Sequence, residues 1–257
     1  MPWNPDQYHK FQATRSAPFE DVAALINVRD KMRVVDLGCG TGELTAKLAN
    51  MLPNSHVLGV DNSSQMLERA QQYKRRGLDF ELGDISDENV LPHSEWDLIF
   101  SHAALHWVED HRSLIPRLLA KVAPGGQIAV QMPSNYNHIA QRLVLDIALE
   151  EPYRTALNGY VRYSSVLSID DYAEMLFAGR FENIIVFEKI YPQVHENSDG
   201  VVEFTKGSVL VPYLERLGDQ ADAFMNTYRQ RLSQHMPGSP VFYSFRRIIF
   251  AATKALA

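Results

Sequence analysis

The stretch from Val34 to Gly42, with the sequence VVDLGCGTG, constrains this chain most strongly. Its apolar half is typical of a buried strand, and its glycine-rich half is typical of a tight turn before a helix from about Glu43. Glycines in such a turn take positive φ angles and let a ligand approach without meeting a Cβ atom. The helix that follows offers free backbone N–H groups at its start. The stretch therefore predicts an α/β protein with a nucleotide-type site after its first strand.

Spacing and charge distinguish between the nucleotides that such a turn can bind. The dinucleotide fingerprint is G-x-G-x-x-G, whereas here the glycines are Gly38, Gly40 and Gly42, and Glu43 takes the place of the third dinucleotide glycine. Asp36, at the strand end, and Glu43 would repel a pyrophosphate. They suit a ligand that carries positive charge, such as the amino group and sulfonium of S-adenosylmethionine. A P-loop is excluded because no Gly-Lys-Ser/Thr follows, and a turn without any ligand is the remaining alternative.

Composition limits the classes to which the chain can belong. Its 257 residues are enough for one large α/β domain with an insertion, or for two small domains. The formal net charge of −6 gives no electrostatic reason to bind nucleic acid, and no apolar run reaches membrane-spanning length. The single cysteine, Cys39, fits a reducing cytoplasm, and the N-terminus does not read as a secretory signal. We expect a cytoplasmic protein, monomeric or weakly homo-oligomeric, that binds neither nucleic acid nor membrane.

Strand and helix patterns alternate through the first half of the chain. Strands are expected at 34–37, 56–61, 78–84, 96–101 and 127–132. Helices are expected at 44–52, from a cap at Ser63 or Ser64 to an end at Gly77, and at 115–122. This alternation predicts a doubly wound, mostly parallel sheet with right-handed crossovers over a core at 30–135. The helix at 115–122 is expected to end at Ala123-Pro124-Gly125-Gly126.

The pattern changes after residue 133. Helices are expected within 136–180 and as a pair within 201–240, and strands within 181–200 and 241–257. We therefore predict an α/β, Rossmann-like sheet of seven strands whose two late strands form an antiparallel edge, with an α-helical cap inserted in the C-terminal half. Residues 1–29 are expected to form a helical segment. Tyr8, Phe11 and Arg15 fall at helical spacing in it, either as a lid over the cofactor or as a face docked on the core.

Acidic residues follow the second and third predicted strands. Asp61 can accept both hydroxyls of an adenosine ribose, in a dinucleotide or in S-adenosylmethionine. Asp84 can accept from the adenine amino group while Ile85 and Met66 sandwich the ring. The alternatives are a helix N-cap for Asp61 and a surface turn for Asp84. The complete candidate cofactor set is Tyr8, Arg15, Asp36, Gly38, Gly40, Asp61, Asn62, Met66, Asp84, Ile85 and Ser101.

Two histidines, His102 and His106, follow the fourth predicted strand. They lie four residues apart, as metal ligands on one helix face do. No acid lies between them as in H-E-x-x-H, and no cysteine is near, so no metal is expected. We expect one histidine to line a substrate pocket and the other to pack.

Several of these motifs together resemble those of the class I S-adenosylmethionine-dependent methyltransferases. They are Asp36-x-Gly38-x-Gly40-x-Gly42, Asp61, Gly83-Asp84-Ile85, and Gly125-Gly126 before the fifth strand, and they cover about residues 30–133. A closer resemblance, to the trans-aconitate methyltransferase family, spans nearly the whole chain. It rests on Trp3-Asn4-Pro5, Tyr8, Phe11, Arg15, His106-Trp107-Val108, Asp110-His111, Ala129-Val130-Gln131-Met132-Pro133, Pro212-Tyr213-Leu214, Phe245 and Arg247. The chain departs from that family at Val209 and Val211, where a glycine and an arginine are usual, and at 187–193.

The resemblance implies the Rossmann-like methyltransferase fold and methyl transfer to a carboxylate oxygen of a small organic acid, with S-adenosylhomocysteine as product. A carboxylate is already ionised at neutral pH, so no general base is needed and catalysis would rest on alignment and desolvation. The candidate catalytic residues are therefore positioning residues: His106, Arg162, Tyr163 and Arg247. Arg162, with Tyr163, is the candidate for a substrate carboxylate, and a surface arginine is its alternative.

Other functions remain open on the sequence alone. The acid could be another one, including a malonyl group bound to an acyl carrier protein. The chain could also be a non-catalytic module that binds S-adenosylmethionine. An NAD-dependent oxidoreductase is disfavoured by Asp36 and Glu43.

Overall fold

The computed structural model describes residues 13–87, 89–91 and 95–256, with only the backbone described for 13–16. These residues form two compact units. The larger unit contains the described chain up to Pro133, then Ser165–Lys189, and then the chain from Arg247 onward. The smaller unit contains Ser134–Ser164 and Ile190–Arg246.

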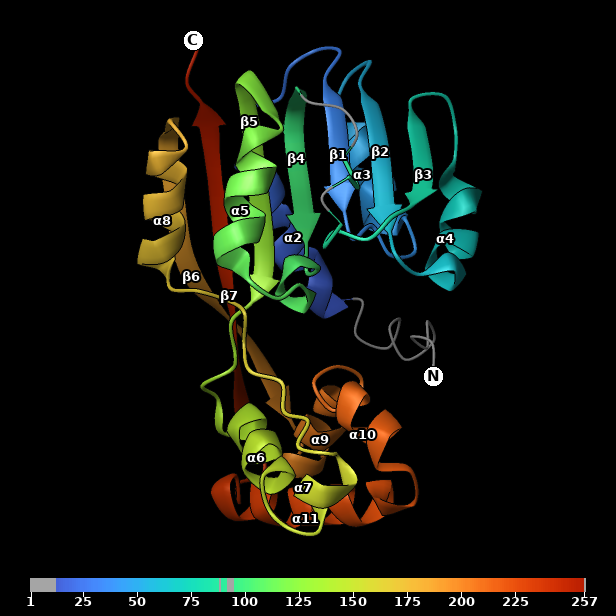
Figure 1. Cartoon of the computed structure of the whole chain (residues 1–257), viewed down its shortest axis with the longest axis vertical. Coiled ribbons are helices and arrows are strands. Elements are labelled where there is room, and N and C mark those ends of the chain that lie inside the picture. The colour runs from blue at the N-terminus through green and yellow to red at the C-terminus, as the bar shows by residue number, and fades with distance from the viewer. Residues whose placement is uncertain (1–12, 88, 92–94, 257) are drawn as a thin grey trace. The chain divides into compact units, whose positions relative to one another are not determined.

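A seven-stranded sheet with strand order β3-β2-β1-β4-β5-β7-β6 organises the fold (Figure 1). The strands are β1 (Arg33–Leu37), β2 (His56–Asp61), β3 (Leu78–Leu82), β4 (Trp96–His102), β5 (Val122–Pro133), β6 (Phe181–His195) and β7 (Val241–Lys254). The strands from β1 to β5 pair in parallel, and β7 runs antiparallel to β5. The prediction of a mostly parallel sheet of seven strands with an antiparallel late strand is confirmed.

Helices cover both faces of the sheet in the larger unit. In the view of Figure 1, α5 lies in front of the sheet and α3 behind it. The helices of this unit are α2 (Ala13–Ala23), α3 (Glu43–Met51), α4 (Ser64–Ala70), α5 (His111–Ala120) and α8 (Ile169–Ala178), with single 3-10 turns η1 (Gln71–Tyr73) and η2 (Leu105–Trp107). This arrangement explains why Val34, Val35 and Leu37 are all fully buried, since a strand covered on both faces reads as a continuous apolar run.

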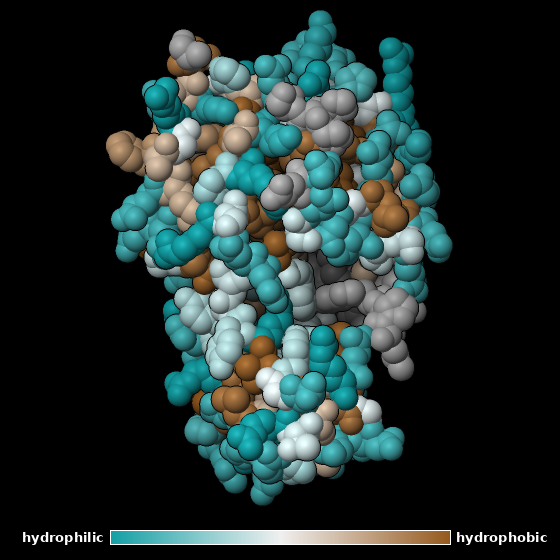
Figure 2. All heavy atoms as spheres, viewed as in Figure 1, coloured by the Kyte–Doolittle hydropathy of each residue, from teal (hydrophilic) through white to brown (hydrophobic). Residues whose placement is uncertain are grey.

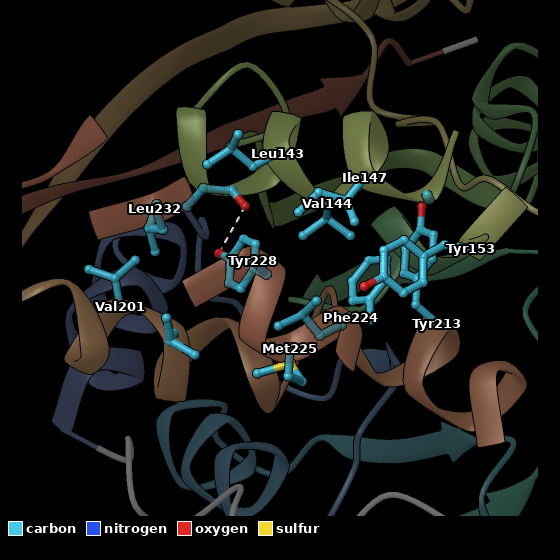
Figure 3. Packing of buried hydrophobic residues seen from close by; sticks show 14 of the residues in the cluster. Leu143, Val144, Ile147, Tyr153, Val201, Tyr213, Phe224, Met225, Tyr228 and Leu232 are labelled. Atoms are coloured by element: carbon cyan, nitrogen blue, oxygen red, sulfur yellow. Dashed lines mark hydrogen bonds between the residues drawn. The ribbon is translucent and has the colours of Figure 1, made fainter. Parts of the chain in front are cut away.

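The smaller unit has a helical core of its own. Its helices are α6 (Ile139–Ala148), α7 (Tyr153–Ala156), α9 (Ser198–Lys206), α10 (Val211–Leu217) and α11 (Ala221–His235), with the 3-10 turn η3 (Gly218–Gln220). Figure 3 shows Tyr228 of α11 among apolar side chains that include Leu143 and Val144 of α6. The Tyr228 hydroxyl donates to the Ala140 carbonyl at 2.9 Å, which meets the need of a buried phenol for a partner.

Three expectations about element boundaries differ from the structure. The predicted cap at 136–180 included α8, but α8 belongs to the larger unit, where its buried Tyr172 stacks on Phe250 at 5.0 Å. The region 201–240 holds three α-helices instead of two, because the chain breaks before α10 as well as at Gly218. Gly125 and Gly126 lie inside β5 and do not stop a helix.

The described part of the N-terminal segment 1–29 contains α2, whose Phe19 is fully buried and meets Phe100 edge-on at 5.8 Å. This part of the segment therefore docks on the core. On the face in Figure 2, hydrophilic residues predominate and hydrophobic residues gather in small groups. Within the described ranges, no helix has both the length and the apolar character needed to cross a bilayer.

Candidate cofactor site

A cavity of about 590 Å³ in the larger unit collects the segments that follow four neighbouring parallel strands. Its walls are Gly38 and Gly40 after β1, Asp61, Asn62, Ser63 and Met66 after β2, Gly83, Asp84, Ile85 and Ser86 after β3, and Ala103, Ala104, Trp107, Val108 and Glu109 after β4. Open α/β sheets bind ligands in this crevice beyond the carboxyl ends of their strands. The cavity is therefore the candidate site.

The glycine turn after β1 forms one wall because only glycine fits there. Gly38 has a φ of 79°, and a Cβ atom on it would lie 2.0 Å from the Cβ of Ala104. The turn is held to the end of β2, since the N–H groups of Gly38 and Cys39 donate to the Val60 carbonyl at 2.8 and 3.0 Å. The backbone of the turn thus faces the cavity without an intervening side chain.

Asp61 at the end of β2 links the glycine turn to the next segment. Its Oδ2 accepts from the Gly40 N–H at 2.8 Å, and its Oδ1 accepts from the Ser63 N–H at 2.9 Å. A carboxylate has about four lone-pair sites, so two remain for donors in the cavity, such as the two hydroxyls of a ribose. The N-cap of α4 is Ser63 and not Asp61, because the Ser63 hydroxyl oxygen accepts from the Met66 N–H at the start of that helix.

Asp84 and two apolar side chains form the wall beyond β3. The Asp84 Oδ1 accepts from the N–H and the hydroxyl of Ser86 at 2.8 and 2.7 Å, and these bonds lower the pKa of Asp84. Asp84 is therefore ionised at neutral pH and can accept from an amino group. Ile85 and Met66 are buried beside it and offer apolar surface for a flat ring. Arg117 of α5 fixes this segment by donating to the Ile85 carbonyl at 3.1 Å.

The charge of the wall decides which ligands suit it. The described lining residues include three acids, Asp61, Asp84 and Glu109, and neither lysine nor arginine. A pyrophosphate would meet these carboxylates without a counter-charge, whereas a cationic ligand with an adenosine would be favoured. Glycine backbone, ribose acceptors and apolar ring contacts together fit S-adenosylmethionine.

Asp36 and Ser101, both expected in the cofactor wall, are not among the residues that line the cavity. Asp36 is 3% exposed, and its Oδ2 accepts from the Thr45 hydroxyl of α3 at 2.6 Å. Burial raises the pKa of Asp36 to about 7, partly opposed by the bond from Thr45. Ser101 is fully buried and donates to the Leu37 carbonyl at 2.8 Å. Strand side chains stand perpendicular to the sheet, which explains how Asp36 reaches a helix that covers the sheet.

Sequence reasoning missed the wall formed after β4. Ala103, Ala104, Trp107, Val108 and Glu109 line the cavity, as do Ser63, Gly83 and Ser86 after the earlier strands. The signal for them was positional: any segment that follows a parallel strand next to the glycine turn faces the same crevice.

The predicted substrate residues are divided between the two units. His106 lies in η2 of the larger unit, with its ring 5.0 Å from that of Trp107, and the buried Arg247 donates from Nη1 to the Gln131 Oε1 at 2.9 Å. Arg162 and Tyr163 lie in the smaller unit. There, the Arg162 N–H donates to the Tyr213 hydroxyl at 2.9 Å, and Tyr163 is 67% exposed. None of these four residues is among those that line the cavity.

The remaining candidates are placed as follows. His102 is buried and meets Phe19 edge-on at 5.9 Å, so it packs in the core. Tyr8 lies outside the described residues, as does the side chain of Arg15, whose backbone belongs to α2. Among the described residues, no group of three or more His, Cys, Asp or Glu side chains could hold a metal ion.

Comparisons with known proteins define the class to which this site belongs. A family model described as "Methyltransferase domain" matches residues 28–170, a range that contains the whole cavity wall. The chain belongs to the S-adenosylmethionine-dependent methyltransferase family and is an enzyme that uses this cofactor.

The relatives narrow the comparison within this family. The chain is 45% identical over 262 residues to a protein of Deinococcus radiodurans named "Trans-aconitate 2-methyltransferase", with 99% of each chain covered. It is 35% identical to a protein of the same name from Variovorax paradoxus, over 92% of this chain and 91% of that one. A solved S-adenosylmethionine-dependent methyltransferase from Mesorhizobium loti shares the fold, with a TM-score of 0.53 at 21% identity, over 93% of this chain and 98% of that chain.

Proposed function

We propose that this methyltransferase methylates a carboxylate oxygen of trans-aconitate or a close analogue. The observation that carries the proposal is the 45% identity, over 99% of both chains, to a relative named for that substrate. The aligned region covers 99% of both chains, so it includes the smaller unit as well as the cofactor site.

The described residues of the cavity account for how the cofactor would be held. When bound, S-adenosylmethionine supplies a methyl group on a positively charged sulfur. Asp61, Asp84, Ile85 and Met66 all line the cavity. Asp61 would accept from the ribose, Asp84 would accept from the adenine amino group, and Ile85 and Met66 would contact the ring. The acidic wall favours the cation electrostatically, and the apolar side chains exclude water from the adenine.

The acid substrate requires orientation more than proton transfer. Its carboxylates are ionised at neutral pH, so the nucleophilic oxygen needs no base. Arg247 is only 4% exposed, and burial of a guanidinium is costly unless it is hydrogen-bonded. Arg247 donates to Gln131, and we propose that its guanidinium also binds a substrate carboxylate, because arginine forms charge-assisted hydrogen bonds with carboxylates. His106, Arg162 and Tyr163 remain candidates for positioning the other carboxylates.

Incubation with methyl-labelled S-adenosylmethionine and a panel of trans-aconitate, cis-aconitate and citrate tests the proposal. We expect label in trans-aconitate above the other acids. If the protein binds S-adenosylhomocysteine but labels none of the three acids, the proposed substrate is wrong. An acid on a carrier protein, such as a malonyl group, or a purely binding role would then account for the cofactor site.

A further inference from the structure

A buried histidine and tyrosine in the larger unit support the segment 103–109, several residues of which line the cofactor cavity. His111, at the start of α5, is 1% exposed, and Tyr172 of α8 is fully buried. The His111 Nδ1 lies 2.6 Å from the Tyr172 hydroxyl, and the His111 Nε2 lies 2.9 Å from the Leu105 carbonyl oxygen. Neither side chain is among the residues that line the cavity.

The partners fix the direction of each hydrogen bond. A carbonyl only accepts, so the His111 Nε2 carries the proton and donates to Leu105. The unprotonated Nδ1 therefore accepts from the Tyr172 hydroxyl, which itself accepts from the Leu167 N–H at 3.1 Å. Burial lowers the pKa of His111, in agreement with a neutral ring. The result is a chain of bonds from the segment before α8, through Tyr172 and His111, to η2.

The segment that receives these bonds needs external support. It begins at Ala103, with a φ of 55°, and ends at Asp110, with a φ of 52°. A non-glycine residue in this left-handed region costs about 1–3 kcal/mol, and the conformation persists only where surrounding structure holds it. Between these two residues the chain makes only one short 3-10 turn, in which the Leu105 carbonyl accepts from both the Val108 N–H and His111. Ser165 adds a bond from its hydroxyl to the His106 carbonyl at 3.4 Å.

We propose that the His111–Tyr172 pair is a positioning device for the methyl-donor site. It holds residues 103–109 in the shape that presents Trp107, Val108 and Glu109 to the cofactor. Without it, the strained turn would relax and the cavity would lose one wall. The inference concerns cofactor binding and does not depend on which acid is methylated.

Tyr172→Phe in the full-length protein tests the pair with a matched control. The variant keeps the ring stacked on Phe250 and removes only the hydroxyl. Tyr228→Phe is the control, because Tyr228 is also fully buried and its hydroxyl also bonds twice, to Thr205 and Ala140, but in the smaller unit. Loss of one or two hydrogen bonds predicts about a tenfold weaker affinity for S-adenosylhomocysteine in Tyr172→Phe, measured by calorimetry, and no change in the control.

Hydrogen exchange of the wall provides a second readout, and the control variant separates a local effect from a general loss of stability. The amides of Trp107 and Val108, bonded to the carbonyls of Ala104 and Leu105 at 2.9 Å, should exchange faster in Tyr172→Phe and at the wild-type rate in Tyr228→Phe. Ser165→Ala, at a partly exposed position, should show a smaller effect of the same kind. His111→Gln, which can still donate to Leu105, should retain more affinity than His111→Phe.

The proposal is overturned if Tyr172→Phe and Ser165→Ala bind S-adenosylhomocysteine as the wild type does and leave the exchange of residues 103–110 unchanged. It is also overturned if Tyr228→Phe weakens binding as much as Tyr172→Phe does. Both readouts use the cofactor product alone, so they succeed or fail separately from the test of the acid substrate.

Discussion

Asp61 carries the most quantitative prediction, because its carboxylate has two roles at once. Its two oxygens accept from the Gly40 and Ser63 N–H groups, and the residue lines the cavity, where its remaining lone pairs are the candidate acceptors for a ribose. In Asp61→Asn the NH₂ group must face one of those two backbone donors, which leaves a donor opposite a donor. The substitution therefore weakens the anchoring of the glycine turn as well as the acceptor for the ribose.

The size of the effect follows from the bonds that are lost. A hydrogen bond to a charged group contributes about 1.5–3 kcal/mol, and two ribose hydroxyls are involved. Water reaches this partly exposed side chain and offsets part of the loss, so we expect a net loss of about 2–3 kcal/mol in cofactor binding. This corresponds to about a 30- to 150-fold weaker affinity for S-adenosylhomocysteine.

Calorimetry with two ligands separates the ribose contact from the anchoring of the turn. The wild type should bind a 2′-deoxy analogue of S-adenosylhomocysteine more weakly than S-adenosylhomocysteine itself. Asp61→Asn should bind the two ligands with equal affinity. Asp79→Asn is the control, since Asp79 is exposed on β3, pairs with Lys74 at 3.0 Å and lies outside the cavity. Affinity of Asp61→Asn within threefold of the wild type, in a folded protein, would refute the ribose assignment.

Three further predictions concern the turn, the buried acid and the buried arginine. Gly38→Ala should weaken S-adenosylhomocysteine binding at least tenfold, because its Cβ would meet Ala104. Gly159→Ala is the control: Gly159 also has a positive φ, of 72°, but a Cβ there would meet no atom within 4 Å, so binding should not change. The raised pKa of Asp36, about 7, means that the folded state keeps a proton that the unfolded state loses near pH 4. This group should therefore lower the free energy of unfolding by up to about 1.4 kcal/mol per pH unit as the pH rises from 4 to 7. Urea titrations at several pH values should show this contribution in the wild type and not in Asp36→Asn. An identical pH dependence in both proteins would contradict the raised pKa of Asp36. Arg247→Met should lower kcat/KM for the acid about tenfold or more, while the affinity for S-adenosylhomocysteine changes little. Arg246→Met, at the exposed neighbouring position, should leave both quantities unchanged. Normal turnover in Arg247→Met would make that arginine structural.

The sheet was predictable from the sequence because its strands alternate with helices in a regular way. Runs such as Val34–Leu37 and Leu98–Phe100 are buried on both faces and read as continuous apolar segments. Asp61, Asp84 and the glycines could be placed because the ends of parallel strands meet at one edge. The resemblance of the motifs to those of methyltransferases then predicted S-adenosylmethionine as the ligand.

Other features depend on contacts that no local pattern reveals. The position of Asp36 in an apolar run does not say which face of the strand it occupies, so its bond to Thr45 could not be foreseen. The helical pattern of 169–178 predicts α8. It does not reveal that α8 packs on β7 of the larger unit, where Tyr172 stacks on Phe250. The wall at 103–109 has no regular period, because left-handed residues bound it and the bonds of His111 and Ser165 hold it.

Transfer of labelled methyl from S-adenosylmethionine to trans-aconitate by the purified full-length chain tests the central claim most directly. We predict a singly methylated trans-aconitate ester, formed in proportion to enzyme and strongly reduced in Asp61→Asn at limiting cofactor. Absence of any labelled ester, from a protein that binds S-adenosylhomocysteine and keeps its fold, would contradict the proposed function.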